Sequence, residues 1–224
     1  MRGLFVTGTG TGVGKTIVSA ALLAAMRAAG EPARAYKPVV TGLEEPAGEW
    51  PPDHELLGLA AGMEPEEVSP LRYGPAVSPH LAASLAHEQI DPVDLIGNAR
   101  TRTSAGETLI VEGVGGLLVP LAENFTVRDL AVELGLALLI AATPGLGTIN
   151  HTLLTIEAAR AAGLEVAAVV LTPWPADPGP MEHSNRETIA GLGAIEVATL
   201  GEVSSPEIAG LASAGGLLPW RSWL

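Results

Sequence analysis

The sequence has 224 residues, a length that favours one domain. Hydrophobic residues make up 47% of the chain, which excludes a disordered polypeptide, and the absence of cysteine excludes disulfides and thiolate metal sites. The formal net charge of −13 argues against broad binding to nucleic acid or to an anionic membrane. The first residues lack the apolar core of a signal peptide, so we expect a cytoplasmic protein.

Short apolar runs alternate with longer helical segments, the pattern of strands in a parallel sheet connected by helices. The expected strands are residues 4–6, 33–39, 108–111, 137–141, 166–171 and 195–199. The expected helices are residues 15–29, 53–61, 127–134, 149–162 and 181–190. Four prolines in residues 172–180 predict a surface loop. We predict a single α/β domain over residues 1–224, with a mostly parallel, doubly wound sheet flanked by helices.

A glycine-rich segment, GTGTGVGKT at residues 8–16, lies between the first expected strand and the first expected helix. Glycines let successive backbone N–H groups turn inward around an anion, and the positive end of the helix dipole lies behind them. Lys15 can then neutralise phosphate charge, and the Thr16 hydroxyl can bind Mg²⁺. The spacing is a variant, because Thr9 stands where the usual glycine is expected. The segment predicts a P-loop NTPase-like fold; the alternative is a glycine-rich turn without a ligand.

Lysine is rare in this chain, which has ten arginines but only two lysines, Lys15 and Lys37. A planar guanidinium cannot replace a compact ammonium that must approach a phosphate or a carbamate end-on. Lys37 ends the second expected strand, and ligands of doubly wound sheets bind at the carboxyl ends of strands. We therefore expect Lys37 beside the phosphate loop, the alternative being a solvated surface lysine.

Two carboxylates are candidate metal ligands. Glu112 follows an apolar strand and precedes the glycine-rich run 113–116, and Asp53 follows two prolines. Mg²⁺ needs only one or two carboxylates beside a hydroxyl, phosphate oxygens and water. Asp53 is a second metal ligand in this interpretation, but a helix N-cap in the alternative one.

A second glycine-rich segment, residues 143–151, also follows an apolar strand and leads into a helix. The free N–H groups at such a helix start can hold a carboxylate. On spacing alone, an ordinary capped helix explains the segment equally well.

Together these motifs resemble the dethiobiotin synthetase family over nearly the whole chain. The resemblance is carried by residues 6–16 (VTGTGTGVGKT), 36–39 (YKPV) with Thr41, 78–80 (SPH), 111–116 (VEGVGG) and 147–151 (GTINH). It implies an ATP- and Mg²⁺-dependent ligase that carboxylates 7,8-diaminononanoate with CO₂ and closes the ring to dethiobiotin, releasing ADP and phosphate. It also implies a homodimer whose substrate site spans two subunits.

The resemblance assigns roles to individual residues. Lys15 and Lys37 would be catalytic and would neutralise the carbamate and the γ-phosphate, and Thr16, Asp53 and Glu112 would hold Mg²⁺. The nucleotide-binding residues would be Gly12, Val13, Gly14, Lys15, Thr16, Ile17, Asp53, Glu112, Gly113, Val114, Gly115, Thr172, Pro173 and Ser204. The substrate-binding residues would be Thr11 and Thr41, together with Leu146, Gly147, Thr148, Ile149 and Asn150 at a helix start that serves the site of the other subunit.

The base-binding positions differ from the family pattern. Thr172 and Pro173 replace an Asn-Asp pair that reads the adenine edge in the family, so we expect weaker selectivity for the base. A second class, the dimeric ATPase switches of chromosome partitioning, shares the expected sheet and the variant loop. That class needs a lysine early in the loop, where this chain has Thr9 and Gly10.

Overall fold

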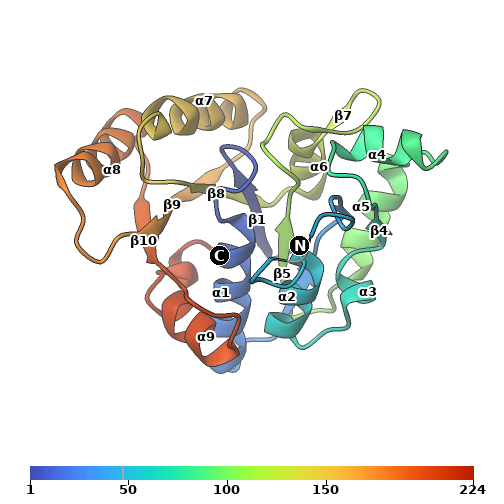
Figure 1. Cartoon of the computed structure of the whole chain (residues 1–224), viewed down its shortest axis with the longest axis horizontal. Helices are drawn as coiled ribbons and strands as arrows, with labels where there is room; N and C mark the ends of the chain where they lie inside the picture. Colours follow the sequence, from blue (N-terminus) through green and yellow to red (C-terminus); the bar gives the residue numbers. More distant parts are fainter. Residues whose placement is uncertain (47) are drawn as a thin grey trace.

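The computed structural model describes residues 1–46 and 48–224, and its centre is a six-stranded sheet (Figure 1). The strand order is β10-β9-β8-β1-β5-β2, and every neighbouring pair in this sheet is parallel. The strands are β1 (Gly3–Gly8), β2 (Ala33–Tyr36), β5 (Thr108–Glu112), β8 (Ala137–Ala142), β9 (Val166–Trp174) and β10 (Val197–Gly201). The predicted parallel α/β architecture is confirmed.

Helices cover both faces of the sheet, because alternate strand residues face opposite cores. Leu4, Val6 and Ile110 pack on α1 (Lys15–Ala28), α2 (Asp53–Ala61), α3 (Pro65–Val68) and α9 (Ile208–Gly216). Phe5 and Val111 belong to the opposite core, with α4 (Pro79–Leu85), α5 (Pro92–Thr101), α6 (Val127–Leu134), α7 (Thr148–Ala161) and α8 (Pro180–Gly193). In Figure 1, α7 and α8 lie above strands β8 to β10, and α9 lies below them.

Smaller elements complete the chain. Strand β3 (Val39–Val40) pairs in parallel with β4 (Leu71–Arg72), and β6 (Pro120–Ala122) forms an antiparallel hairpin with β7 (Phe125–Thr126). A short 3₁₀ helix, η1 (Trp220–Ser222), leads to the C-terminus and buries Trp220. No helix in residues 1–46 and 48–224 is long and apolar enough to cross a membrane.

Helices α2 and α6 have the bounds that the sequence predicts, but every strand of the central sheet differs at one end at least. Strands β1, β5 and β8 are one to three residues longer than expected, and the other three differ as follows. Strand β2 ends at Tyr36, not at residue 39, because Pro38 has no N–H for a ladder and the Lys37 N–H donates to Val68 O. Strand β10 begins and ends two residues later than residues 195–199. Strand β9 runs to Trp174, so the first part of the predicted loop 172–180 is strand.

Candidate active site

The phosphate loop turns between the end of β1 at Gly8 and the start of α1 at Lys15. Gly12 and Gly14 have φ angles of 73° and 88°, in the left-handed region that glycine adopts without strain. At Gly8 an added Cβ would lie 2.6 Å from the Val13 Cγ2 atom. The loop therefore needs glycine at these three positions to keep its shape.

The start of α1 is left open for an anion. Its N-cap, Gly14, offers no side chain to the first N–H groups, and its first turn contains no acidic residue. Helices α2, α3, α5, α6 and α8 each carry at least one acidic residue in the first turn. The positive end of the α1 dipole is therefore not neutralised by a side chain of its own first turn, which favours an external phosphate.

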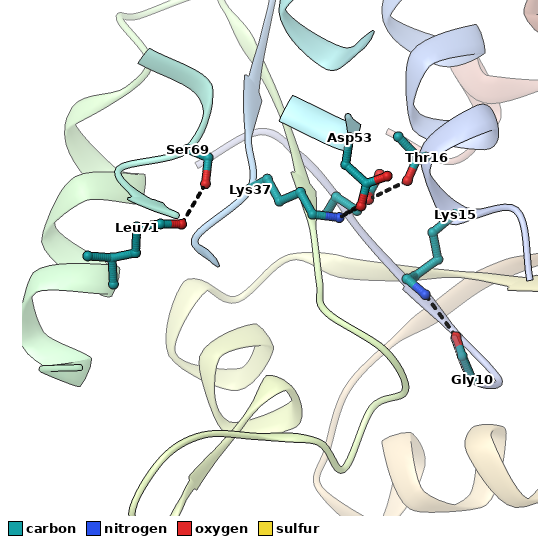
Figure 2. A network of polar contacts seen from close by, with 8 residues as sticks. Gly10, Lys15, Thr16, Lys37, Asp53, Ser69 and Leu71 are labelled. Carbon is teal, nitrogen blue, oxygen red and sulfur yellow. Dashed lines mark hydrogen bonds and ion pairs between the residues drawn. The ribbon is translucent and has the colours of Figure 1, made fainter. Parts of the chain in front are cut away.

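Lys15 lies against the same loop. Its Nζ atom donates to the Gly10 carbonyl oxygen at 2.8 Å, as Figure 2 shows. Burial lowers the pKa of the Lys15 ammonium, and the attraction of Glu112 offsets this only in part. The side chain is 7% exposed and lines the cleft described below, so its charge is directed at whatever binds there.

Lys37 is held between two carboxylates. Its Nζ atom lies 2.5 Å from Asp53 Oδ2 and 2.5 Å from Glu112 Oε1, and its side chain is 3% exposed. Burial alone would lower the pKa of Lys37, but the attraction of Glu112 and Asp53 outweighs burial and holds that pKa above its usual range. The alternative of a solvated surface lysine is wrong.

Thr16 and the two carboxylates form a compact set of oxygen atoms. Glu112, the last residue of β5, accepts a hydrogen bond from Thr16 Oγ1 at 2.9 Å. Asp53 is the first residue of α2, after the N-cap Pro52, so it is not the N-cap of the alternative interpretation. Burial would raise the pKa of Asp53, but the nearby Lys37 ammonium outweighs this and holds it below its usual range. Figure 2 shows Lys37 and Thr16 on opposite sides of the Asp53 carboxylate.

This set fits a hard divalent cation. Within residues 1–46 and 48–224, Glu112 Oε2 is buried and has no hydrogen-bond partner, so one carboxylate oxygen is free for a ligand. No cluster of three or more His, Cys, Asp or Glu side chains suited to a metal occurs in this described part of the chain. A cation held by Thr16, Asp53 and Glu112 would therefore need phosphate or water oxygens as well, which is how Mg²⁺ binds beside a nucleotide.

A cleft of about 670 Å³ opens over these groups. Eleven of the predicted site residues line it: Thr11, Gly12, Gly14, Lys15, Thr16, Ile17, Lys37, Thr41, Asp53, Val114 and Gly115. The structure thus brings the predicted phosphate, metal and lysine residues to the carboxyl ends of β1, β2 and β5.

Other predicted residues lie outside this cleft. Glu112 is fully buried and contacts Lys37 and Thr16 directly, and Gly113 follows it. Thr172 is buried next to the phosphate loop, since a Cβ added at Gly14 would lie 2.6 Å from its Cγ2 atom. Those not among the lining residues are Val13, Glu112, Gly113, Leu146, Gly147, Thr148, Ile149, Asn150, Thr172, Pro173 and Ser204.

Eight residues that line the cleft were not predicted as site residues from the sequence. Most are apolar, and they are Trp50, Pro51, Leu56, Ala76, Val77, Ser78, Pro79 and Val119. Residues 78–80 carried the resemblance to the family, which was the available signal for Ser78 and Pro79. Trp50 and Pro51 lie in a connection with no periodic pattern, so the sequence alone offers no sign that they line the cleft.

Comparisons with known proteins identify relatives of this chain. A family model described as an AAA domain matches residues 2–209. An ATP-dependent dethiobiotin synthetase of Anaeromyxobacter sp. (strain Fw109-5) is 49% identical over 173 residues, covering 76% of this chain and 76% of the relative. Another, of Mycobacterium sp. (strain KMS), is 41% identical over 207 residues, covering 92% of this chain and 90% of the relative.

A solved ParA family ATPase of Chlorobium tepidum TLS has a similar fold, with a TM-score of 0.52. The match covers 96% of this chain and 89% of that protein, but the sequences are only 13% identical, so this likeness supports the fold alone. The curated relatives are similar over most of their length and share the activity printed in their names. The chain therefore belongs to the dethiobiotin synthetase family of ATP-dependent ligases, with an AAA-type P-loop domain.

Proposed function

We propose that this chain, as a single domain in the cytoplasm, converts 7,8-diaminononanoate, CO₂ and ATP to dethiobiotin, ADP and phosphate with the help of Mg²⁺. The observation that carries the proposal is that both lysines of the chain line one cleft. Two ammonium groups beside an open helix start suit a reaction in which two anions, a carbamate and a triphosphate, must meet.

In this reaction the residues of the chain would neutralise the negative charge of the reactants and hold the reacting groups in position. An amine nitrogen of the substrate attacks CO₂ and loses a proton to water, and Lys37 neutralises the carbamate that forms. Lys15 and the loop N–H groups hold the γ-phosphoryl group while a carbamate oxygen attacks its phosphorus and ADP leaves. The second amine then attacks the carbamate carbon, phosphate departs, and the amine proton passes to water as the ring closes. Mg²⁺ held by Thr16, Asp53 and Glu112 would neutralise phosphate charge.

The aliphatic chain of the substrate would lie against apolar side chains that line the cleft, among them Trp50, Leu56 and Val77. Thr11 and Thr41 line the same cleft and can hydrogen-bond polar groups of the substrate.

A homodimer would complete the site with the start of α7. Its N-cap, Gly147, has a φ angle of 92°, and its first turn contains no acidic residue. Leu146 is 95% exposed, which suits a segment that a second subunit covers. We propose that residues 146–150 of one subunit hold the substrate carboxylate in the site of the other.

The direct test is incubation with 7,8-diaminononanoate, bicarbonate and MgATP, followed by mass spectrometry for dethiobiotin and a phosphate assay. The expected result is one phosphate for each cyclic urea formed. Omitting the diamine is the control. Phosphate release that does not depend on the diamine would instead support the alternative function, an ATPase switch. The solved protein of similar fold is itself a ParA family ATPase.

A further inference from the structure

Lys37 occupies the position where a cation would be expected. Its ammonium lies 2.5 Å from oxygen atoms of both Asp53 and Glu112. Glu112 Oε1 accepts from Lys37 and from Thr16, so the three proposed metal-binding side chains converge on the same small volume. The lysine is thus the counter-charge of this carboxylate pair.

Glu112 depends on that counter-charge. It is 0% exposed, and in the described part of the chain Lys37 is the cationic side chain that forms an ion pair with it. A buried carboxylate without a partner is strongly unfavourable, so a positive charge must be present here before the metal arrives. The Lys15 ammonium does not supply it directly, because it donates to the Gly10 carbonyl.

The oxygen left free within the described residues, Glu112 Oε2, belongs to the same carboxylate that Lys37 contacts, so a divalent cation bound there would lie close to the ammonium. Like charges repel strongly at such a separation in a buried site. We propose that Lys37 is the resting counter-ion of the Asp53–Glu112 pair, and that a divalent cation entering between these carboxylates displaces it into the cleft. This rests on the proposed metal role of Thr16, Asp53 and Glu112, but not on the identity of the substrate.

Displacement is sterically open to this side chain. Lys37 already lines the cleft, and a lysine carries its charge on four rotatable methylene groups. The released ammonium would then face a bound anion instead of Asp53 and Glu112. Metal binding would therefore precede capture of the carbamate by Lys37. This order would prevent the carbamate from binding to Lys37 in a site that has no metal.

The two-lysine composition gives a direct test. Protein labelled with ¹³C at lysine Cε contains two such groups, and Lys15→Met identifies which NMR signal belongs to Lys37. We expect Mg²⁺ added without nucleotide to shift the Lys37 signal more than the Lys15 signal, along a saturable curve. Saturable Mg²⁺ binding, measured by calorimetry, with an unmoved Lys37 signal would overturn the exchange while leaving the metal site intact.

A second measurement uses Mn²⁺ as the probe, with the free ion counted by electron paramagnetic resonance. Removing the competing ammonium in Lys37→Met should tighten Mn²⁺ binding by about 10- to 100-fold. Lys15→Met removes the same charge from the same cleft without a carboxylate hydrogen bond, and should tighten binding by less than about fivefold. Equal gains in the two variants, or weaker binding in Lys37→Met, would overturn the exchange.

Thermal unfolding of both variants checks that they are folded. The NMR titration is made on the wild-type protein and uses Lys15→Met only to assign the two signals. Absence of saturable Mn²⁺ binding in both wild type and Lys37→Met would overturn the exchange and the proposed metal site together. Dethiobiotin formation could then still be measured, so a failure of the lysine exchange can be distinguished from a failure of the proposed function.

Discussion

At the scale of single residues, the cleft brings together the two lysines of an acidic molecule. The chain carries a net charge of −13, yet both of its lysines line one cleft. Local ammonium groups and backbone N–H groups, and not the overall field, must therefore attract anionic ligands. The rarity of lysine made this pair predictable from the sequence, whereas the ion pairs of Lys37 required the fold, because Asp53 and Glu112 are far from it along the chain.

Lys37→Ala tests the catalytic assignment. Since preorganised charge is worth roughly 100- to 1000-fold in rate, we expect kcat for dethiobiotin formation to fall by at least about 100-fold. Nucleotide affinity should change by less than about fivefold, because the phosphate loop and Lys15 remain. Steady-state kinetics and calorimetry measure the two quantities. Unchanged turnover would remove Lys37 from the mechanism.

Asp53→Asn tests the ion pair through its pH dependence. The pKa of Asp53 is lower in the folded chain than its ordinary value of 3.8, so its carboxylate stabilises the fold above that pH, and this contribution disappears as the pH falls through the lowered pKa. With 46% of the side chain exposed, the loss at pH 7 should not exceed about 1 kcal/mol. Thermal unfolding without metal should show a difference from wild type that shrinks below pH 3.8.

Glu55→Gln is the matched control for this prediction. Glu55 is exposed in the same first turn of α2 and forms no ion pair with any residue of the described chain. Its variant removes a charge from the same turn without breaking an ion pair, so it should change the free energy of unfolding at pH 7 by less than about 0.5 kcal/mol. A difference for Asp53→Asn that does not change with pH would contradict the assigned ion pair.

At the scale of elements, the sequence predicted the bounds of α2 and α6 but not the exact strand ends, and α4 and α9 were not among the expected helices. Helix α6 carries its own boundaries, with a Thr126 capping box and Gly135 in the left-handed conformation after it. Strand β9 does not: it continues through Pro173 because β10 shifts its register there, with Thr199 opposite Leu171 and Gly201 opposite Trp174. Such an irregularity accommodates proline, but it depends on a partner strand that local sequence patterns cannot specify.

Gly215→Ala tests how α9 supports the helix behind the phosphate loop. A Cβ added at Gly215 would overlap the Ala21 carbonyl oxygen of α1, a backbone atom that cannot move aside easily. We expect a loss of about 2 kcal/mol in the free energy of unfolding, measured by urea denaturation. Gly216→Ala, the matched control, meets no atom within 4 Å and should change that free energy by less than about 0.5 kcal/mol. Equal effects would show that α9 does not pack tightly on α1.

At the scale of the whole molecule, the sheet order explains where the site lies. Strand β1 is flanked by β5 and β8, so the phosphate loop after β1 meets Glu112 at the end of β5 on one side. The start of α7, after β8, lies on the other side of the loop. Both glycine-rich segments can be recognised in the sequence. In a single chain, however, residues 146–150 do not line the cleft, so the proposal includes a second subunit.

Subunit mixing tests the shared site. If each site combines Lys37 of one subunit with Asn150 of the other, a heterodimer of Lys37→Ala and Asn150→Ala subunits contains one intact site and one doubly altered site. Its activity should be about half that of wild type, although both parent homodimers are impaired, Asn150→Ala through a KM for the diamine raised roughly tenfold. Two different affinity tags isolate the heterodimer, and dethiobiotin formation is measured at low diamine concentration. If Lys37 and Asn150 instead served the same subunit, no site would be intact and activity would not exceed the mean of the parents.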